Sequence, residues 1–225
     1  MQEKSQGFMN GFTLKLIAVI AMTIDHIGYI FIDPNTSAYL YFRGIGRIAF
    51  PIFCFLIVEG FHHTKSPLNY LFRLSVFALL SEVPFDLAFF GTFFDPNHQN
   101  VFVTLALGLA CLFCLEEMKS RQWFGIFFAI LLTVSFFIQS DYGIGGVLMI
   151  CMFYITKDSV WVRIILFGLI CYVFFGVAEL PALASLIFIY LYNNKRGTNK
   201  MQWFFYCYYP LHLIILYSIN TYLIH

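Results

Sequence analysis

Long apolar stretches follow one another along almost the whole chain, and short segments that carry most of the charged residues separate them. A helix that crosses a bilayer needs about 20 mostly apolar residues. The backbone groups of such a segment must be hydrogen-bonded within it, and this favours helices because no alternation typical of barrel strands occurs. The pattern predicts an all-α polytopic membrane bundle with about nine spans, at 13–32, 45–62, 68–90, 99–117, 122–139, 143–157, 160–176, 180–193 and 202–223.

Positive charges lie in alternate connecting segments of this predicted bundle. They are Lys4, Lys65, Lys119, Arg121, Lys157, Lys195, Arg196 and Lys200, whereas the segments in between carry Asp33, Asp95, Asp141 and Glu179. The positive-inside rule therefore predicts a cytoplasmic N-terminus and an outer C-terminus. We expect a single transmembrane domain over residues 1–225, embedded in the lipid bilayer.

Composition strengthens the membrane assignment. The 225 residues are 60% hydrophobic and only 11% charged, whereas a soluble domain carries about 25% charged residues. The net charge of +1 gives no reason to expect a nucleic-acid partner. Cys111 and Cys114 form a C-x-x-C pair without a second pair or a neighbouring histidine, so we predict apolar packing for the six cysteines and no metal site.

Charged residues inside the first predicted span are the first candidates for function. A charge near the bilayer centre costs about 2.5–3.5 kcal/mol, so such residues usually face a polar interior. Lys15 and His26 are separated by about three helical turns, which places them on one face, about 16 Å apart along the axis. Asp25 adjoins His26. The structural alternative is that Lys15 anchors the inner end while Asp25 and His26 pair with one another.

Arg43 and Arg47 stand one helical turn apart on the predicted outer side, where positive charge is unexpected. Their predicted depth is that of Asp25 and His26, so we expect partners there. In the third span, Glu82 and Asp86 are four residues apart and share a face, although Pro84 disturbs the helix. 

We expect these two carboxylates to face the arginines in an outer polar cluster. The alternative is a charge network that only holds helices together. Four further residues are weaker candidates. Glu59 lies at the inner end of the second span, and Asp141 and Tyr142 precede a glycine-rich helix start that would admit a ligand or a close helix. His212 follows Pro210 and is otherwise isolated in apolar sequence.

Five stretches occur in order between residues 14 and 148: LKLIAVIAMTIDHIG (14–28), RIAFPIFCFLIVEGF (47–61), LLSEVPFDLAF (79–89), NVFVTLALGL (100–109) and DYGIGGVL (141–148). Together they resemble the TraX family, named for the conjugation protein that acetylates the amino terminus of pilin. More loosely, Lys15 and His26 fit the Lys/Arg-x10-His pattern of type 3 membrane acyltransferases. The segments FPIF and YPLH are similar to parts of that wider superfamily, which includes the lysosomal glucosaminide acetyltransferases.

The resemblance implies transfer of an acyl group, usually acetyl from acetyl-CoA, to an acceptor on the outer side of the membrane. The acceptor would be a peptide amino terminus, a glycan or a lipid headgroup. In this interpretation His26 is the general base, because imidazole changes protonation near neutral pH. An acetyl-imidazole intermediate is an alternative. The remaining catalytic candidates are Asp25, Glu82 or Asp86, to fix the tautomer of His26, and Arg43 or Arg47, to stabilise the oxyanion. 

The candidates for binding acetyl-CoA are Lys15, Glu59, Asp141, Tyr142 and His212. Two other functions remain open at this point. Proton-coupled transporters also use intramembrane charges and histidines, although they often show inverted repeats. No such repeat is visible, and about nine spans divide poorly into two halves. The second alternative is a non-catalytic assembly protein, which would not need a cation and a histidine on one face.

Overall fold

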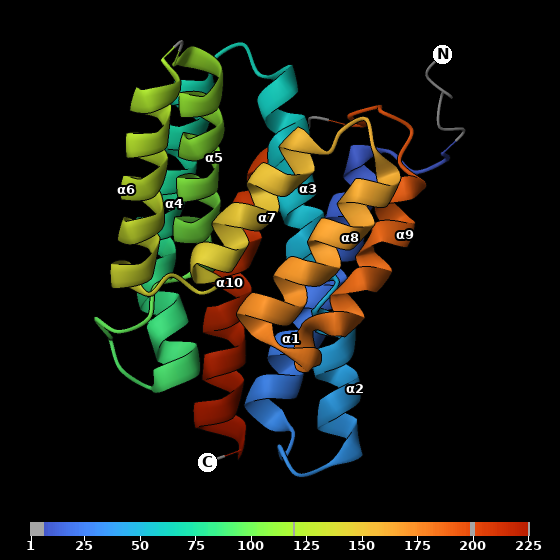
Figure 1. The fold of residues 1–225 in the computed structure, drawn as a ribbon. Helices are drawn as coiled ribbons and strands as arrows, with labels where there is room; N and C mark the ends of the chain where they lie inside the picture. Colours follow the sequence, from blue (N-terminus) through green and yellow to red (C-terminus); the bar gives the residue numbers. More distant parts are fainter. Residues whose placement is uncertain (1–6, 119, 199–200, 225) are drawn as a thin grey trace. The chain divides into compact units, whose positions relative to one another are not determined.

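The computed structural model of the protein describes residues 7–118, 120–198 and 201–224 (Figure 1). Within these residues the backbone is helical, and apart from two isolated β-bridges no extended pairing occurs. Lys4, Lys119 and Lys200, three of the predicted inner charges, lie outside the described residues. The all-α prediction is confirmed for the described part of the chain.

The described residues form two compact units. The terminal unit takes its residues from Met1–Leu56 and Cys171–His225, and the central unit is Ile57–Ile170. The terminal unit contains α1 (Gly11–Phe31), α2 (Ser37–Gly46), the first part of α3 (Ala49–His63), η1 (Cys171–Phe175), η2 (Val177–Ala184), α9 (Ser185–Tyr190), α10 (Gln202–Ile219) and η3 (Asn220–Ile224). The central unit contains the rest of α3, with α4 (Pro67–Phe90), α5 (Val101–Glu117), α6 (Arg121–Ile138), α7 (Gly143–Ile155) and α8 (Val160–Ile170).

Each predicted span coincides with helical structure, but the second begins earlier than predicted. Helix α2 starts at Ser37, because the side chain of Thr36 accepts a hydrogen bond from Tyr39 N and caps the helix. A short turn at Arg47 and Ile48 then separates α2 from α3. The prediction that this span starts at residue 45 is therefore wrong, and Arg43 lies inside a helix rather than before one.

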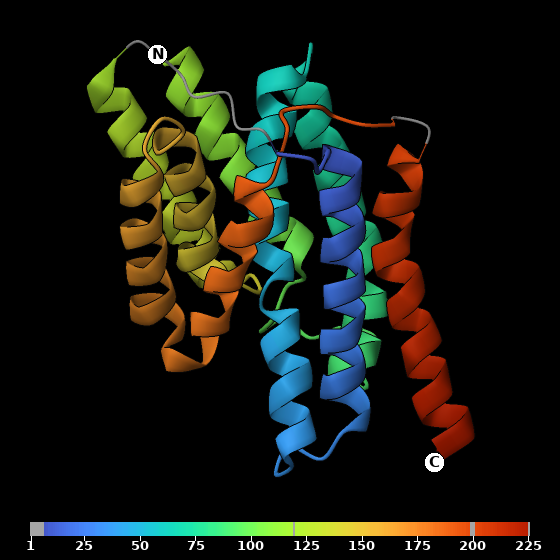
Figure 2. The same cartoon turned by 90° about the vertical axis from the view of Figure 1, so that its right-hand side faces the viewer.

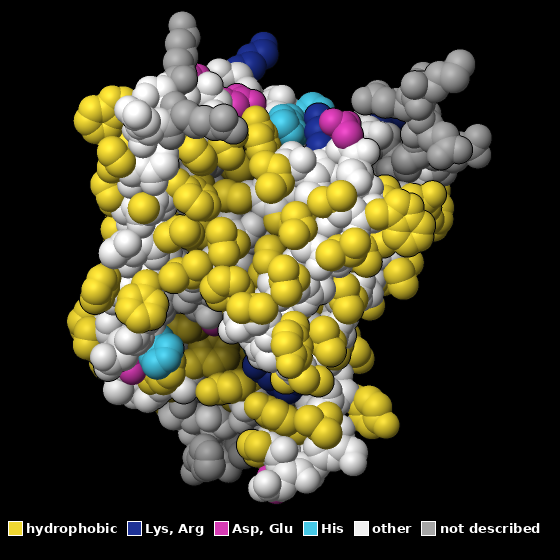
Figure 3. All heavy atoms as spheres, viewed as in Figure 1, with side chains coloured by type: hydrophobic (Ala, Val, Ile, Leu, Met, Phe, Trp, Pro, Cys, Tyr) yellow, Lys and Arg dark blue, Asp and Glu magenta, His cyan; other side chains and the backbone are white. Residues whose placement is uncertain are grey.

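Among the residues that the structure describes, two helical stretches, Gly11–Phe31 and Ser37–His63, are long and apolar enough to cross a membrane by length and composition. Many large apolar side chains outside the core are exposed, such as Trp161 on α8 and Phe137 on α6. Figure 3 shows one face on which hydrophobic side chains dominate. A surface of this kind suits contact with lipid better than contact with water, and the count of about nine spans stays a prediction.

Helices α1 and α2 form a tight hairpin in the terminal unit (Figure 2). The turn between them is held by Asp33, whose side chain accepts from Asn35 N at 2.9 Å. The helices approach most closely at two glycines. A Cβ added to Gly28 would lie 2.5 Å from Cβ of Phe42, and one added to Gly46 would lie 2.1 Å from Oδ1 of Asp25. These positions accept only a hydrogen atom in place of a side chain.

Helix α10 packs against another face of α1. The rings of Phe12 and Phe205 meet edge to face with centroids 5.7 Å apart, and the hydroxyls of Thr23 and Tyr208 are 2.8 Å apart. The segment that precedes α10 crosses the start of α1, where Gly11 N donates to Lys195 O at 2.8 Å. The two ends of the chain therefore build one unit.

In the central unit, α5 packs against α4, α6 and α7. Leu109 and Leu112 of α5 are fully buried, and Gly108 allows the side chain of Ile150 on α7 to approach closely. Asn100 caps α5 by accepting from Phe102 N at 3.0 Å, and its amide donates to Ala78 O at 2.7 Å. This cap ties the start of α5 to α4.

We expect Gly46→Ala to lower the free energy of unfolding by about 1–3 kcal/mol, because the added methyl group would overlap Asp25. The measurement is thermal unfolding in detergent. Gly44→Ala is the matched control: it lies on the same helix, has nothing within 4 Å of the added Cβ, and should be neutral or stabilising by up to about 1 kcal/mol. Equal unfolding temperatures for the two variants would contradict the close packing of α1 and α2.

Candidate functional site

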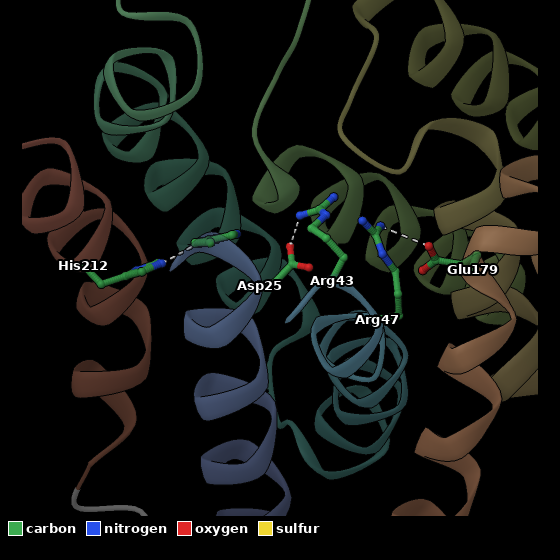
Figure 4. Close-up of polar contacts among 6 residues, drawn as sticks. Asp25, Arg43, Arg47, Glu179 and His212 are labelled. Atoms are coloured by element: carbon green, nitrogen blue, oxygen red, sulfur yellow. Dashed lines mark hydrogen bonds and ion pairs between the residues drawn. The ribbon is translucent and has the colours of Figure 1, made fainter. Parts of the chain in front are cut away.

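Four charged side chains of the terminal unit form two ion pairs, which we call the charged cluster (Figure 4). Nη1 of Arg43 on α2 donates to Oδ2 of Asp25 on α1 at 2.6 Å. Nη1 of Arg47 donates to Oε2 of Glu179 on η2 at 3.0 Å. Two guanidinium groups and two carboxylates make the cluster electrically neutral.

The charged cluster follows from the antiparallel path of α2 beside α1. Because the chain turns at Asp33, Arg43 returns to the level of Asp25, as its predicted depth required. The guanidinium carbon of Arg43 also lies 5.2 Å from the ring centroid of Tyr29. Glu179 is only 3% exposed. A charge at such a position is tolerated when a partner compensates for its lost hydration.

Each carboxylate of the charged cluster pairs with an arginine through one oxygen. The other oxygens, Asp25 Oδ1 and Glu179 Oε1, are buried and have no hydrogen-bond partner within the described part of the chain. Most buried polar atoms in proteins are hydrogen-bonded. These two oxygens are therefore available to accept a hydrogen bond from a bound molecule.

A histidine pair joins α1 to α10. His26 Nδ1 and His212 Nε2 are 2.7 Å apart, and the rings are nearly parallel, with an interplanar angle of 8°. His212 Nδ1 lies 2.9 Å from the carbonyl oxygen of Tyr208, one turn earlier on the same helix. His212 is buried, whereas His26 is partly exposed. His26 is therefore the member of the pair that a substrate can reach more easily.

Lys15 lies on the same face of α1 as His26, as the spacing of the two residues predicts. Nζ of Lys15 is 5.6 Å from the ring centroid of Phe205 on α10, and His26 meets His212 on the same helix. Phe205 and His212 are about two helical turns apart. Both α1 residues therefore point toward α10, with Lys15 near the start of α1 and His26 deeper along it.

Basic residues gather at the start of α1. The backbone of Lys195 accepts a hydrogen bond from Gly11 N at 2.8 Å, so the segment with Lys195 and Arg196 runs beside the first turn of the helix that carries Lys15. Nη2 of Arg196 donates to Gln202 at 3.3 Å. We call Lys15, Lys195 and Arg196 the basic end of the terminal unit. It lies on the side that the charge distribution predicts to be cytoplasmic.

The expected pairing of Glu82 and Asp86 with the arginines is not what the structure shows. Oε2 of Glu82 accepts a short hydrogen bond from the Asn100 amide, and Oδ2 of Asp86 accepts from Asp95 N at 2.9 Å. Both contacts lie within the central unit, and the arginines pair with Asp25 and Glu179 instead. The physical reason is the early start of α2, which brings the first arginine beside the acid of α1.

The other predicted site residues have local contacts in the central unit. The backbone carbonyl of Glu59 contacts Nδ1 of His63 at 2.8 Å. Asp141 N donates to Gln99 O at 2.9 Å, and Tyr142 N donates to the Thr104 hydroxyl at 3.4 Å. These bonds fix the turn between α6 and α7. The roles of Glu59, Asp141 and Tyr142 in binding a donor stay predictions.

Sequence reasoning missed Glu179 as a site residue. It was counted only as an outer loop charge, because it precedes the predicted span at 180–193. The available signal was the unusual arginine at 47, which needs an acid as partner. Sequence reasoning assigned that partner to the carboxylates of the third span rather than to a residue 132 positions away.

The fold and the site define an all-helical protein, over the described residues, with an apolar exterior, partly buried ion pairs and a histidine pair. The chain belongs to the TraX family: the family described as "TraX protein" matches residues 10–220.

The chain also has relatives among known proteins. The chain is similar to a probable fimbrial assembly protein FimC, serogroup H1, of Dichelobacter nodosus, with 29% identity over 245 residues, covering 95% of this chain and 97% of that protein. It is also 51% identical over 49 residues to an uncharacterized protein of Rickettsia prowazekii (strain Madrid E), covering 22% of this chain and 18% of that protein. No solved structure matches the chain.

We expect Arg47→Met to lower the free energy of unfolding by about 3–5 kcal/mol, because it leaves the Glu179 carboxylate buried without its ion-pair partner. The double variant Arg47→Met/Glu179→Leu should recover most of this loss, since it removes both charges. Thermal unfolding in detergent measures both effects. Lys65→Met, at an exposed lysine, is the control for loss of one cation. A double variant no more stable than Arg47→Met would show that the two residues are not coupled.

Proposed function

We propose that the protein is a membrane-embedded acyltransferase that moves an acetyl group from cytoplasmic acetyl-CoA to an amine or hydroxyl acceptor on the outer side of the membrane. The observation that carries this proposal is the face of α1 that presents Lys15 near one end and His26 deeper, both against α10. Membership of the TraX family supports it. The proposed location is the inner membrane of a bacterium, with a cytoplasmic N-terminus.

The basic end supports a binding site for the donor. Coenzyme A carries several phosphate charges, and a cluster of Lys15, Lys195 and Arg196 attracts a polyanion from the cytoplasm. The acyl end of the donor would then extend from Lys15 toward His26, about 16 Å further along the helix. An acceptor would reach His26 from the opposite side.

The chemistry assigned to the terminal unit is addition to a thioester. The nitrogen or oxygen of the acceptor forms a bond to the acyl carbon while His26 takes its proton. The carbonyl oxygen becomes an oxyanion, and the C–S bond then breaks as the protonated His26 returns the proton to the sulfur of coenzyme A. Direct transfer and an acyl-histidine intermediate both fit the position of His26.

Arg43 and Arg47 are the candidates for stabilising the oxyanion. A guanidinium group has five N–H donors, and the ion pairs to Asp25 and Glu179 are made through Nη1 of each residue. Their carboxylate partners hold the guanidinium groups in fixed positions, and preorganised donors are the most effective kind in a site that excludes water.

The fimbrial assembly name of the Dichelobacter nodosus relative supports an acceptor among proteins exported to the cell surface. Glycans and lipid headgroups with a free hydroxyl or amine fit the same chemistry. The acceptor group is therefore an amine or hydroxyl on the outer side, carried by any of these classes of molecule.

Acetyl-CoA should raise the unfolding temperature of the detergent-solubilised protein in a saturable manner. Ligand at 100 times its Kd stabilises by about 2.7 kcal/mol. We expect Lys15→Ala to weaken this stabilisation, because it removes one cation from the basic end, and Lys65→Ala, at an exposed lysine of the central unit, to leave it unchanged. Absence of any shift in folded wild-type protein at millimolar acetyl-CoA would contradict the proposal and favour a proton-coupled transporter.

Replacement of His26 by Asn should lower acetyl transfer by about 10²–10⁴-fold, the usual contribution of a general base. The assay supplies radiolabelled acetyl-CoA to the cytoplasmic side of membrane vesicles and measures label in material on the other side. His98→Asn, at an exposed histidine of the central unit, is the matched control. Full incorporation with a folded His26→Asn protein would exclude His26 as the base.

A further inference from the structure

The hydrogen bonds of the histidine pair determine where its protons lie. His212 Nδ1 is 2.9 Å from the carbonyl oxygen of Tyr208, and a carbonyl oxygen only accepts hydrogen bonds. His212 Nδ1 must therefore carry a proton. In a neutral imidazole the other nitrogen is then an acceptor, so His212 Nε2 accepts the hydrogen bond from His26 Nδ1 at 2.7 Å.

The opposite direction of this hydrogen bond requires a charged ring. If His212 Nε2 were the donor, both nitrogens of His212 would carry protons and the ring would be an imidazolium. His212 is 6% exposed, and the carboxylates of the charged cluster already pair with Arg43 and Arg47. A further uncompensated buried charge is strongly unfavourable. The neutral arrangement, with His26 as donor, is the stable one.

We propose that His212 is a positioning residue that holds His26 in the Nδ1–H tautomer and so keeps the lone pair on His26 Nε2. Its role is then to orient the base, in place of the donor binding predicted for it from the sequence. The tautomer follows from the hydrogen bonds and from the burial of His212. Only the use of Nε2 as the base rests on the proposed acyltransferase function.

The proton balance of the transfer step follows from this tautomer. The proton of the acceptor N–H or O–H moves to His26 Nε2 as the new bond to the acyl carbon forms. His26 is then an imidazolium that still donates from Nδ1 to His212 Nε2. When the C–S bond breaks, the proton on Nε2 passes to the sulfur of coenzyme A, and the neutral tautomer is restored. His212 accepts the Nδ1–H hydrogen bond of the catalytic histidine and orients its ring, as the carboxylate does in a Ser-His-Asp triad, but without a negative charge.

A second contact joins the same two helices. The hydroxyl of Thr23 donates to Val19 O at 2.8 Å, so its single proton is used there and the hydroxyl of Tyr208 donates to Thr23 at 2.8 Å. The ring of Tyr208 stacks on that of His212 with an interplanar angle of 12°. Tyr208 therefore contacts His212 in two ways: its backbone carbonyl accepts a hydrogen bond from Nδ1, and its ring stacks on the imidazole.

Nitrogen NMR of the protein with ¹⁵N-labelled histidine rings tests the tautomer directly. Each signal is assigned from a variant in which one histidine is replaced. We expect wild-type His26 to show a protonated Nδ1 and an unprotonated Nε2. His63, whose Nδ1 also contacts a backbone carbonyl one turn earlier, provides an internal reference for the Nδ1–H signal. A wild-type His26 that carries its proton on Nε2 would overturn the proposal, whatever the variants do.

Two replacements of His212 distinguish the effect of its hydrogen-bond acceptor from the effect of its side-chain volume. His212→Gln places an amide oxygen near the position of Nε2 and should keep His26 in the Nδ1–H form, whereas His212→Leu offers no acceptor and should release it. Tyr208→Phe is the matched control, because it removes the hydroxyl contact to Thr23 but leaves the carbonyl and the tautomer. An unchanged His26 tautomer in folded His212→Leu protein would overturn the proposal.

The transfer assay distinguishes this proposal from the acyltransferase function itself. We expect His212→Leu to lose at least about tenfold in transfer rate, with the stabilisation by acetyl-CoA unchanged and the rate substantially restored in His212→Gln. A normal rate in His212→Leu would reject the positioning role and leave the acyltransferase in place. A wild-type protein without transfer or acetyl-CoA binding, but with the Nδ1–H tautomer, would reject the acyltransferase and leave the hydrogen-bonded arrangement.

Discussion

The ion pair between Asp25 and Arg43 is the constraint around which the terminal unit is built. Two charges in apolar surroundings are tolerated only when they meet with good geometry, and this requires the backbones of α1 and α2 to approach closely. Gly28 and Gly46 make that approach possible, since neither position has room for a Cβ. Once α2 is placed, Arg47 follows one turn later and meets its own acid on η2.

The neutrality of the charged cluster defines the environment of the histidine pair. Each arginine is matched by a carboxylate, so the cluster adds no net charge beside His26. A neutral imidazole backed by a second imidazole and a backbone carbonyl is compatible with such surroundings. A carboxylate in the place of His212 would add a buried charge that requires a further cation. The pairing of two histidines avoids this requirement.

Features that depend on local periodicity could be predicted from the sequence. The apolar stretches indicated the helices, and the helical repeat placed Lys15 and His26 on one face. The start of α2 could not be predicted from hydropathy, because its first turns contain exposed aromatic residues such as Tyr41, which are also typical of a membrane interface. Glu179 and His212 lie 132 and 186 residues from their partners, and a single sequence carries no signal that joins such distant positions.

The terminal unit is built from two stretches of the chain that are far apart in sequence, so a relative can share the site only if it matches both stretches. Its polar residues come from the first 56 residues, which hold Asp25 and His26, and from the segment after residue 170, which holds Glu179 and His212. A match of 49 residues is too short to contain both parts, so the segment shared with the Rickettsia prowazekii protein cannot by itself form this site. The match to the Dichelobacter nodosus protein covers 95% of this chain and so includes both parts. Because the histidine pair and the ion pair between Arg47 and Glu179 join segments far apart in sequence, the site depends on the folded unit as a whole rather than on one motif.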